Sequence, residues 1–449
     1  MFLFFQLINL IIGIFGYVCS PNYYSRLLCI VAMIIFVLSF VELVVYKKEN
    51  NYFTFEVIFS ITYFFVFYMY PVIAKPLGVY NFLYTYNEGI ITKATFLATV
   101  GYITFAIGNA SLSLIRYRFR ISNFRSGEKE YYNTTGKLGL PIILCAAVLL
   151  LTFLQFFVFH ANRYETIETG GTIDGIWSYI NIIEHGIVMA SITIGFYGIY
   201  RDEDYRLEKK NLALWILIGL SVLASFVAGY RAVPMGYVIA IIAGWVIFKG
   251  GMSSIRLFIL AVIGFILMNY IMIMRDSGSA QFSFNIINLA SDLITNNYSL
   301  YKGYDYVQNH GFVLFPLAGP LITAIPFLLS RVMSLFQIPD YYASTASFLT
   351  YETIGNLRLG MGSNVIISIY LSLGFFGVLI LMYFLGKYVR YVSTNIKEAS
   401  MMRLLLYFEI MAIAVYMVRG DLFYSVSHIV WGIVFLKIFQ KVSFRKAGR

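Results

Sequence analysis

Arginines stand beside three apolar stretches of this chain, at positions where an anion could bind. Arg231 shortly precedes Pro234 at the start of one stretch. Arg275 ends a second, and Arg419 lies just before the last. Free N–H groups at a helix N-terminus favour anions, so converging guanidinium groups there would suit a strongly anionic ligand such as pyrophosphate. Each arginine could instead meet lipid headgroups, and Asp421 could cap the final helix.

Candidate general bases are concentrated in residues 275–362, a stretch of mixed polarity in an otherwise apolar chain. A carboxylate or an imidazole there could accept the proton of a substrate hydroxyl group. The candidates are Asp292, Asp305, His310, Asp340 and Glu352. Arg331 and Arg358 in the same stretch could bind further anionic groups. Each of these residues could instead be an ordinary solvated loop residue.

Three tyrosines in the same stretch recur at helical spacing. Tyr298, Tyr301 and Tyr304 would share one side of a helix. Aromatic faces of this kind suit stacking on sugar rings. They are also typical of an aromatic belt at the membrane interface, so both interpretations stay open.

Motifs for nucleotide or metal chemistry are absent from the sequence. It contains no P-loop and no His-Glu-x-x-His pattern. Cys19, Cys29 and Cys145 fit neither a disulfide framework nor a metal site. We therefore expect neither a metal nor a cofactor. Chemistry outside the cytoplasm would then need an already activated substrate, because nucleoside triphosphates are not available there.

The composition places all these residues in a membrane protein. Of 449 residues, 60% are hydrophobic and only 12% are charged, against about a quarter charged in soluble domains. Apolar stretches of about 20 residues, the length of a helix that crosses the hydrocarbon, recur along the chain. The net charge of +11 comes from basic residues spread over short loops, which indicates membrane topology rather than nucleic-acid binding.

We predict an all-α polytopic membrane protein with about twelve transmembrane helices and one long extracytoplasmic loop. Helices 1–9 would lie in residues 1–274, the loop in 275–362, and helices 10–12 with a basic tail in 363–449. The expected spans are residues 2–18, 27–46, 53–73, 90–115, 138–159, 176–200, 211–228, 233–248, 255–274, 363–386, 404–418 and 422–439.

Basic residues set the expected orientation. Most of the 33 Lys and Arg residues fall in loops and a tail that the positive-inside rule assigns to the cytoplasm. Both termini are then cytoplasmic, and residues 275–362 are outside. The apolar segment 312–329 contains Pro316, Pro320 and Pro326, and counting it as a span would move the basic tail outside. We therefore predict an interfacial or re-entrant segment.

Several titratable residues lie within the predicted spans, where charge is costly unless it faces the bundle interior. They include Glu56, Glu184, His185, Glu409 and His428. A proton relay and simple helix packing are both compatible with their positions.

Three short tracts carry a family resemblance: AGYRA at 228–232, ASFLTYE at 346–352 followed by Gly360 and Ser363-Asn364, and VRGD at 418–421. Together with the long loop they make the chain similar to the bacterial polysaccharide repeat-unit polymerases of the Wzy type, which include O-antigen and enterobacterial common antigen polymerases. The N-terminal half is similar in hydropathy only.

The resemblance implies a glycosyltransferase of the bacterial cytoplasmic (inner) membrane. It would polymerise undecaprenyl-pyrophosphate-linked oligosaccharide repeat units at the outer face. Its partners would be that glycolipid and membrane lipids, and could include a chain-length regulator protein. Arg231, Arg419 and Arg275 would stabilise the pyrophosphate leaving group.

The resemblance also ranks the candidate bases. Glu352 is the first choice because it lies in a matching tract, and His310 and Asp421 are alternatives. Two other functions stay open. An O-antigen ligase would share the long outer loop and the lipid-linked donor, and a lipid-linked oligosaccharide flippase or other transporter would also fit about twelve spans.

Overall fold

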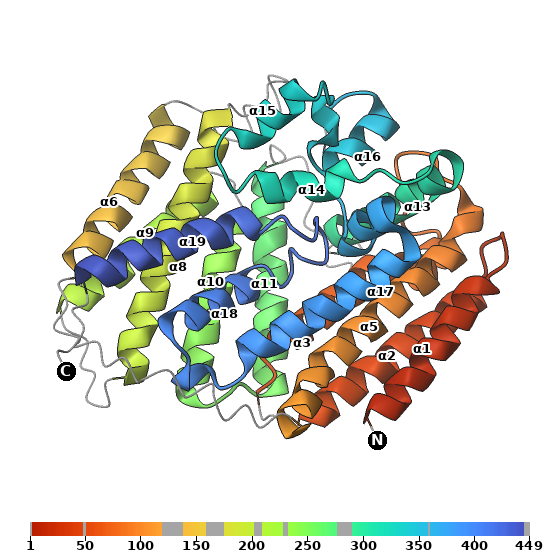
Figure 1. The fold of residues 1–449 in the computed structure, drawn as a ribbon, viewed down its shortest axis with the longest axis horizontal. Coiled ribbons are helices and arrows are strands. Elements are labelled where there is room, and N and C mark those ends of the chain that lie inside the picture. Colours follow the sequence, from red (N-terminus) through yellow and green to blue (C-terminus); the bar gives the residue numbers. More distant parts are fainter. Residues whose placement is uncertain are drawn as a thin grey trace. The chain divides into compact units, whose positions relative to one another are not determined.

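The computed structural model describes residues 2–47, 51–118, 138–158, 175–201, 209–227, 232–275, 290–357 and 360–443. Every regular element in these residues is helical, as predicted (Figure 1). The chain divides into two compact units. The first unit comprises residues 1–115, 282–391 and 414–424, and the second comprises 116–281, 392–413 and 425–449.

The first unit contains the N-terminal helices and the helices of the long loop. Its main helices are α1 (Phe2–Val18), α2 (Arg26–Lys47), α3 (Phe55–Phe67), α5 (Ile91–Arg118), α13 (Ser291–His310), α14 (Phe315–Ile322), α15 (Leu328–Leu335), α16 (Thr345–Ile354) and α17 (Val365–Ser393). Short turns of helix join them: η1 (Met69–Ala74), α4 (Lys75–Leu77), η2 (Glu88–Ile90) and η4 (Asp340–Ala343). The last residues of α5 and α17 pass into the second unit.

The second unit is built from the middle of the chain and two C-terminal helices. Its elements are α6 (Gly139–Phe153), η3 (Leu154–Val158), α8 (Gly175–Arg201), α9 (Lys209–Val227), α10 (Ala232–Lys249), α11 (Ser254–Arg275), η5 (Ile396–Glu398), α18 (Met401–Ala412) and α19 (Val426–Ser443).

Six described helices are long and apolar enough to cross a membrane: Arg26–Lys47, Glu88–Ser111, Gly139–Val158, Trp177–Ile199, Ala232–Lys249 and Val365–Ser393. The count becomes seven if the bent pair Phe55–Phe67 and Met69–Leu77 is one span. Three shorter apolar helices also coincide with predicted spans: Phe2–Val18, Leu212–Val227 and Ser254–Gly264. The membrane class is confirmed, whereas the number twelve stays a prediction.

Two predicted spans near the C-terminus are shorter as helices than expected. The span predicted at 404–418 is helical only to Ala412, and the one predicted at 422–439 begins as a helix at Val426. The chain between them turns irregularly and packs in the first unit. Hydropathy could not locate the ends of the helices, because the residues before Arg419 and after Asp421 are largely apolar.

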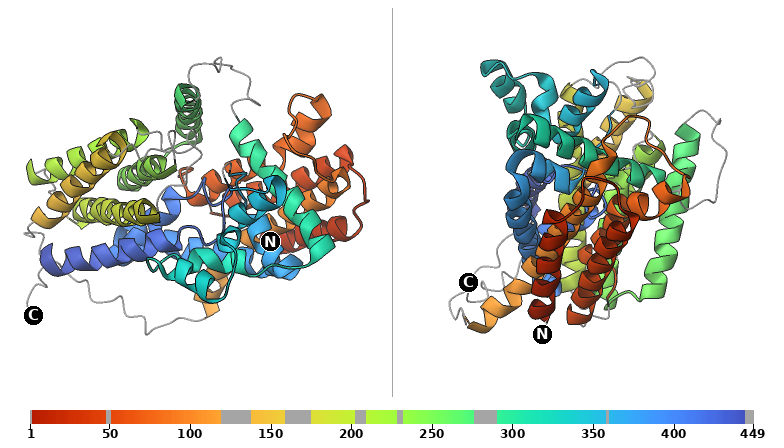
Figure 2. Two further views of the ribbon diagram at one scale, coloured as in Figure 1. Left: turned by 90° about the horizontal axis from the view of Figure 1, so that it is seen from above. Right: turned by 90° about the vertical axis from the view of Figure 1, so that its right-hand side faces the viewer.

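The apolar segment at 312–329 forms no continuous helix. It is divided between α14 and α15, each of eight residues. Eight residues rise about 12 Å, less than half of the hydrocarbon thickness, so neither helix could cross alone. In Figure 1 and in the right-hand view of Figure 2, the teal helices of the long loop lie toward one end of the long helices of the first unit.

Helices α5 and α17 approach each other closely enough to place their backbones in contact. A Cβ atom on Gly108 would lie 2.0 Å from the Tyr383 carbonyl oxygen, and one on Gly386 would lie 2.0 Å from that of Phe105. A side chain at either position would therefore force the helices apart. This packing anchors α17, whose first turns carry the polar residues described next.

Candidate functional site

Local sequence signals define α16, the helix that carries Glu352. The Ser344 hydroxyl caps its start by accepting a hydrogen bond from the Ser347 N–H at 3.1 Å. Gly355 ends it with a positive φ of 76°, a conformation that glycine adopts at little cost. The tract at 346–352 therefore forms one short helix with Glu352 near its C-terminal end.

A buried carboxylate joins two of the three tracts that carry the family resemblance. Asp421 is 7% exposed. One of its oxygens accepts a hydrogen bond from the Ser363 hydroxyl at 2.6 Å, and the other accepts one from the Thr345 N–H at 3.0 Å. Thr345 is the first residue of α16, so Asp421 satisfies a backbone donor at the start of that helix. The expectation that Asp421 caps the final helix was wrong, because its carboxylate is already engaged by α16 and Ser363.

Backbone contacts extend this connection, which we call the Asp421 junction and define as Asp421, Ser363 and Thr345. The Val365 N–H donates to the Val418 carbonyl oxygen at 3.2 Å, and the Leu422 N–H donates to the Ser368 hydroxyl at 3.2 Å. The turn at 414–424 is thereby fixed to the first turn of α17.

Burial makes the Asp421 carboxyl group a weaker acid than usual. Loss of hydration raises the pKa of Asp421 to about 6, although its hydrogen bonds from Ser363 and Thr345 act in the opposite direction. A carboxyl group with this pKa can change its charge near neutral pH. Because both oxygens already hold donors, its geometry is that of a structural connection.

Arg419 is not a free cation in this structure. Its guanidinium donates to the Asp292 carboxylate at 2.8 Å and lies 5.4 Å from the ring centre of Tyr416. The two charged side chains are 21% and 41% exposed, so solvent still reaches the pair. An incoming anion would compete with Asp292 for Arg419.

Glu352 and His310 both lie beside Tyr306, although they come from different helices. The His310 ring stacks on Tyr306 with centroids 4.6 Å apart, and Tyr306 meets Phe348 edge to face at 5.0 Å. Burial and then the charge of Glu352 raise the pKa of Tyr306. Both Glu352 and His310 are exposed, so two candidate bases share one accessible surface.

An aromatic pair completes this surface. Tyr341 of η4 stacks on Tyr351 of α16 with centroids 4.0 Å apart and nearly parallel planes. Tyr351 is 38% exposed and precedes Glu352 directly. We call Tyr306, His310, Tyr341, Tyr351 and Glu352 the α16 face. The sequence offered no signal for the tyrosine pair, since its members meet only through the fold.

The tyrosines expected to stack on sugar occupy the interior instead. Tyr298, Tyr301 and Tyr304 are each no more than 2% exposed. The Tyr298 hydroxyl donates to the Thr85 carbonyl oxygen at 3.1 Å, and that of Tyr304 lies 3.1 Å from the Tyr17 hydroxyl. Their rings pack against other rings, so a sugar could reach them only if the surrounding side chains moved.

The remaining predicted anion-binding residues are only partly described. Arg231 and Arg358 lie outside the described residues, and Arg275 is known only as the last residue of α11. Arg331 is exposed on α15. Convergence of the arginines therefore stays a prediction. Among the described residues, no group of three or more His, Cys, Asp or Glu could hold a metal ion.

Loops that the basic residues assign to one side of the membrane do contact each other. The Thr85 carbonyl belongs to the loop before α5, Tyr298 to the long loop, and Asp421 to the last turn. The three loops therefore lie on the same side. The long apolar helices define the chain as a helical membrane protein. Its candidate catalytic residues come from loops that contact one another within the first unit.

The chain belongs to the O-antigen polysaccharide polymerase Wzy family, because a model of that family matches residues 2–446. This match spans both units and all three resembling tracts. It supports the role of a polysaccharide polymerase, and hence of an enzyme, for this chain. Comparison with the curated proteins and with the solved structures found no match.

Proposed function

We propose that this protein transfers a growing glycan from undecaprenyl pyrophosphate onto a newly delivered lipid-linked repeat unit, at the outer face of the bacterial cytoplasmic membrane. A hydroxyl oxygen of the acceptor sugar would form the new bond to the anomeric carbon of the donor. The bond from that carbon to the pyrophosphate would break, and the lipid pyrophosphate would leave as an anion. The Asp421 junction carries this proposal, because it joins two tracts of the family resemblance and fixes α16.

Glu352 is the proposed general base. It is exposed at the α16 face, beside a tyrosine pair whose edge could guide a sugar ring toward it. His310, whose ring stacks on Tyr306, is the alternative base. Asp421 would position α16 rather than accept the proton, since both of its oxygens hold hydrogen bonds.

Arg419 is proposed to stabilise the leaving pyrophosphate once it exchanges Asp292 for phosphate oxygens. Arg231, Arg275, Arg331 and Arg358 would extend the anion-binding surface. This chemistry needs no nucleotide, because the lipid-linked donor already carries an activated sugar. The proposed topology keeps both termini in the cytoplasm and the α16 face outside.

Complementation of a deletion strain tests the proposal. The wild-type gene should restore long-chain polysaccharide, whereas a strain without it should attach only single repeat units. Glu352→Ala and Arg419→Ala should each lower long-chain product about 100-fold or more, the range for loss of a general base or an oxyanion-stabilising group. Glu398→Ala, in the short helix η5 of the second unit, is the matched carboxylate control.

The outcomes separate the alternative functions. Complete loss of attached polysaccharide in the deletion strain would indicate a ligase. Full activity of Glu352→Ala and Arg419→Ala, with loss of activity on substitution of Glu184, His185 or Glu409, would indicate a transporter.

A further inference from the structure

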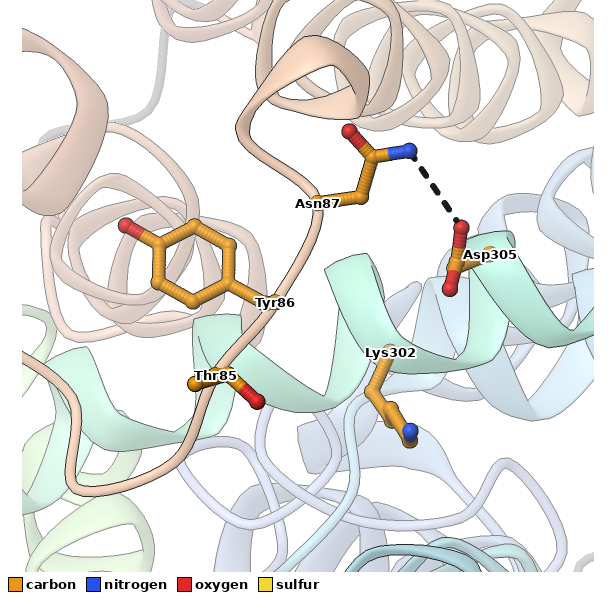
Figure 3. Close-up of a pocket in the computed structure, with 5 residues that line it drawn as sticks. All are labelled: Thr85, Tyr86, Asn87, Lys302 and Asp305. Atoms are coloured by element: carbon orange, nitrogen blue, oxygen red, sulfur yellow. Dashed lines mark hydrogen bonds between the residues drawn. The ribbon is translucent and has the colours of Figure 1, made fainter.

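A polar pocket of about 320 Å³ lies between the loop before α5 and helix α13 (Figure 3). Thr85, Tyr86 and Asn87 line it from the loop, and Lys302 and Asp305 line it from the helix. All five residues belong to the first unit. Its volume lies at the lower end of the range of small-ligand sites, about 300–1,000 Å³.

Buried aromatic contacts hold the loop in place. The Tyr298 hydroxyl donates to the Thr85 carbonyl oxygen at 3.1 Å, and the Tyr86 ring stacks on Tyr301 with centroids 5.7 Å apart. The Asn87 side chain accepts a hydrogen bond from the Gly89 N–H at 3.0 Å, which caps the short helix η2. The loop side of the pocket is therefore already fixed, and binding would need little ordering of that loop.

The charged groups of the pocket have few partners within the protein. The Asn87 amide donates to one Asp305 oxygen over a long 3.4 Å. Within the described residues, no other hydrogen bond is found for Asp305 and none for the Lys302 ammonium, and no ion pair joins the two. Figure 3 shows their charged ends apart on successive turns of α13. The pocket thus offers acceptors and donors to a ligand.

We infer that this pocket binds one sugar unit of the glycan, beside the α16 face. Lys302 and Asp305 balance each other in charge, so the lining does not favour a phosphate group. A carboxylate that accepts, and an ammonium and an amide that donate, match the neighbouring hydroxyl groups of a sugar ring. Lys302 precedes Tyr306 by four residues, so the two lie about 40° apart around α13, and the pocket borders the α16 face on that helix.

This inference rests on the proposed function and deepens it. A second sugar site would hold the glycan while one end reacts. Losing that hold should release chains earlier, so the polysaccharide should become shorter while polymerisation itself continues.

The test measures binding to the purified full-length protein in detergent. The probe is the repeat-unit oligosaccharide released from the host polysaccharide, followed by saturation-transfer NMR. Asp305→Ala and Lys302→Ala should each weaken binding about tenfold, as expected for loss of a charge-assisted hydrogen bond. Gln308→Ala, an exposed α13 residue outside the pocket, should bind like the wild type.

Chain length in the complemented deletion strain is the second readout. A shorter polysaccharide with both pocket variants, and not with Gln308→Ala, supports the inference. Wild-type binding and wild-type chain length for both variants would overturn it. Binding that inorganic pyrophosphate abolishes in the wild type, and that both variants lack, would overturn the assignment to sugar.

Failure of the proposed function gives a different result. In that case the wild-type gene would not restore long-chain polysaccharide at all, whatever the pocket variants bind.

Discussion

Two buried carboxylates, one in each unit, differ in their hydrogen-bond partners. In the first unit both oxygens of Asp421 accept hydrogen bonds from uncharged donors, the Ser363 hydroxyl and the Thr345 N–H. In the second unit Glu409 of α18 is fully buried, and one of its oxygens lies 3.0 Å from the His185 Nε2 atom. Its other oxygen has no partner in the described part of the chain.

Other buried titratable side chains lie close to Glu409 or to its partner His185. The His185 ring stacks on Tyr237 and meets the His428 ring edge to face at 4.6 Å. Glu184 is buried next to His185 in α8. Asp421 therefore orders loops at the family tracts, whereas Glu409 joins helices α8 and α18 within a bundle. Burial of a carboxylate among polar groups would not by itself distinguish the Asp421 junction from the helix packing around Glu409.

The largest effect should come from removing the Asp421 carboxyl group. Asp421→Ala leaves the Ser363 hydroxyl and the Thr345 N–H buried without an acceptor, and we expect a loss of about 4 kcal/mol together with loss of polymer. Asp421→Asn should retain the fold and the polymer, since its amide can donate to Ser363 while its oxygen accepts from Thr345. Thermal unfolding in detergent and polysaccharide analysis measure both. An inactive but folded Asp421→Asn protein would show that Asp421 is the base.

The pH dependence of stability should reveal the same residue. Its pKa is about 6 in the folded protein against an ordinary 3.8, so the folded carboxyl group holds its proton more tightly than the unfolded one. This contribution is complete below about pH 4 and is lost as pH rises past about 6, in total about 3 kcal/mol. Asp421→Asn should lose this dependence in unfolding measurements from pH 4 to 8. An unchanged slope in that variant would assign the dependence to another group.

Substitution of Glu409 should cost less. Glu409→Ala removes the partner of His185 and leaves a cavity, with an expected loss of about 2 kcal/mol. Glu409→Gln should change the free energy of unfolding by less than about 1 kcal/mol, because an amide can still bond to a neutral imidazole. Both variants should make long-chain polysaccharide when expressed at wild-type levels. A stable Glu409→Gln protein without activity would show that the residues around Glu409 have a function in proton transfer rather than in helix packing.

The smallest effect is expected at the partly exposed ion pair between Arg419 and Asp292. Asp292→Asn weakens a partly exposed ion pair, so stability should change by less than about 1 kcal/mol. The freed Arg419 should bind inorganic pyrophosphate more tightly, seen as a larger rise in melting temperature than in the wild type. Arg419→Ala is the matched control and should show no such rise. Equal protection of all three proteins would remove Arg419 from the proposed leaving-group site.

The class of protein and most of its helices could be predicted from the amino-acid sequence alone. Long apolar stretches require internally satisfied backbone groups, and in a chain of this composition that means helices. The prolines of 312–329 correctly indicated that no continuous helix forms there. The tract around Glu352 and the VRGD turn also carried the family, which the match over residues 2–446 confirmed.

Which polar residues meet, and which tyrosines are accessible, depends on how the helices pack in three dimensions. Asp421 finds its partners 58 and 76 positions away along the chain. The spacing of residues along the sequence does not predict such a contact, because the packing of α16 and α17 brings the partners together. The same holds for Tyr298, Tyr301 and Tyr304: their spacing predicted a shared helix side, but exposure depends on what covers that side. Burial is a property of neighbours, so the accessible α16 face could be recognised only once α13, η4 and α16 were placed together.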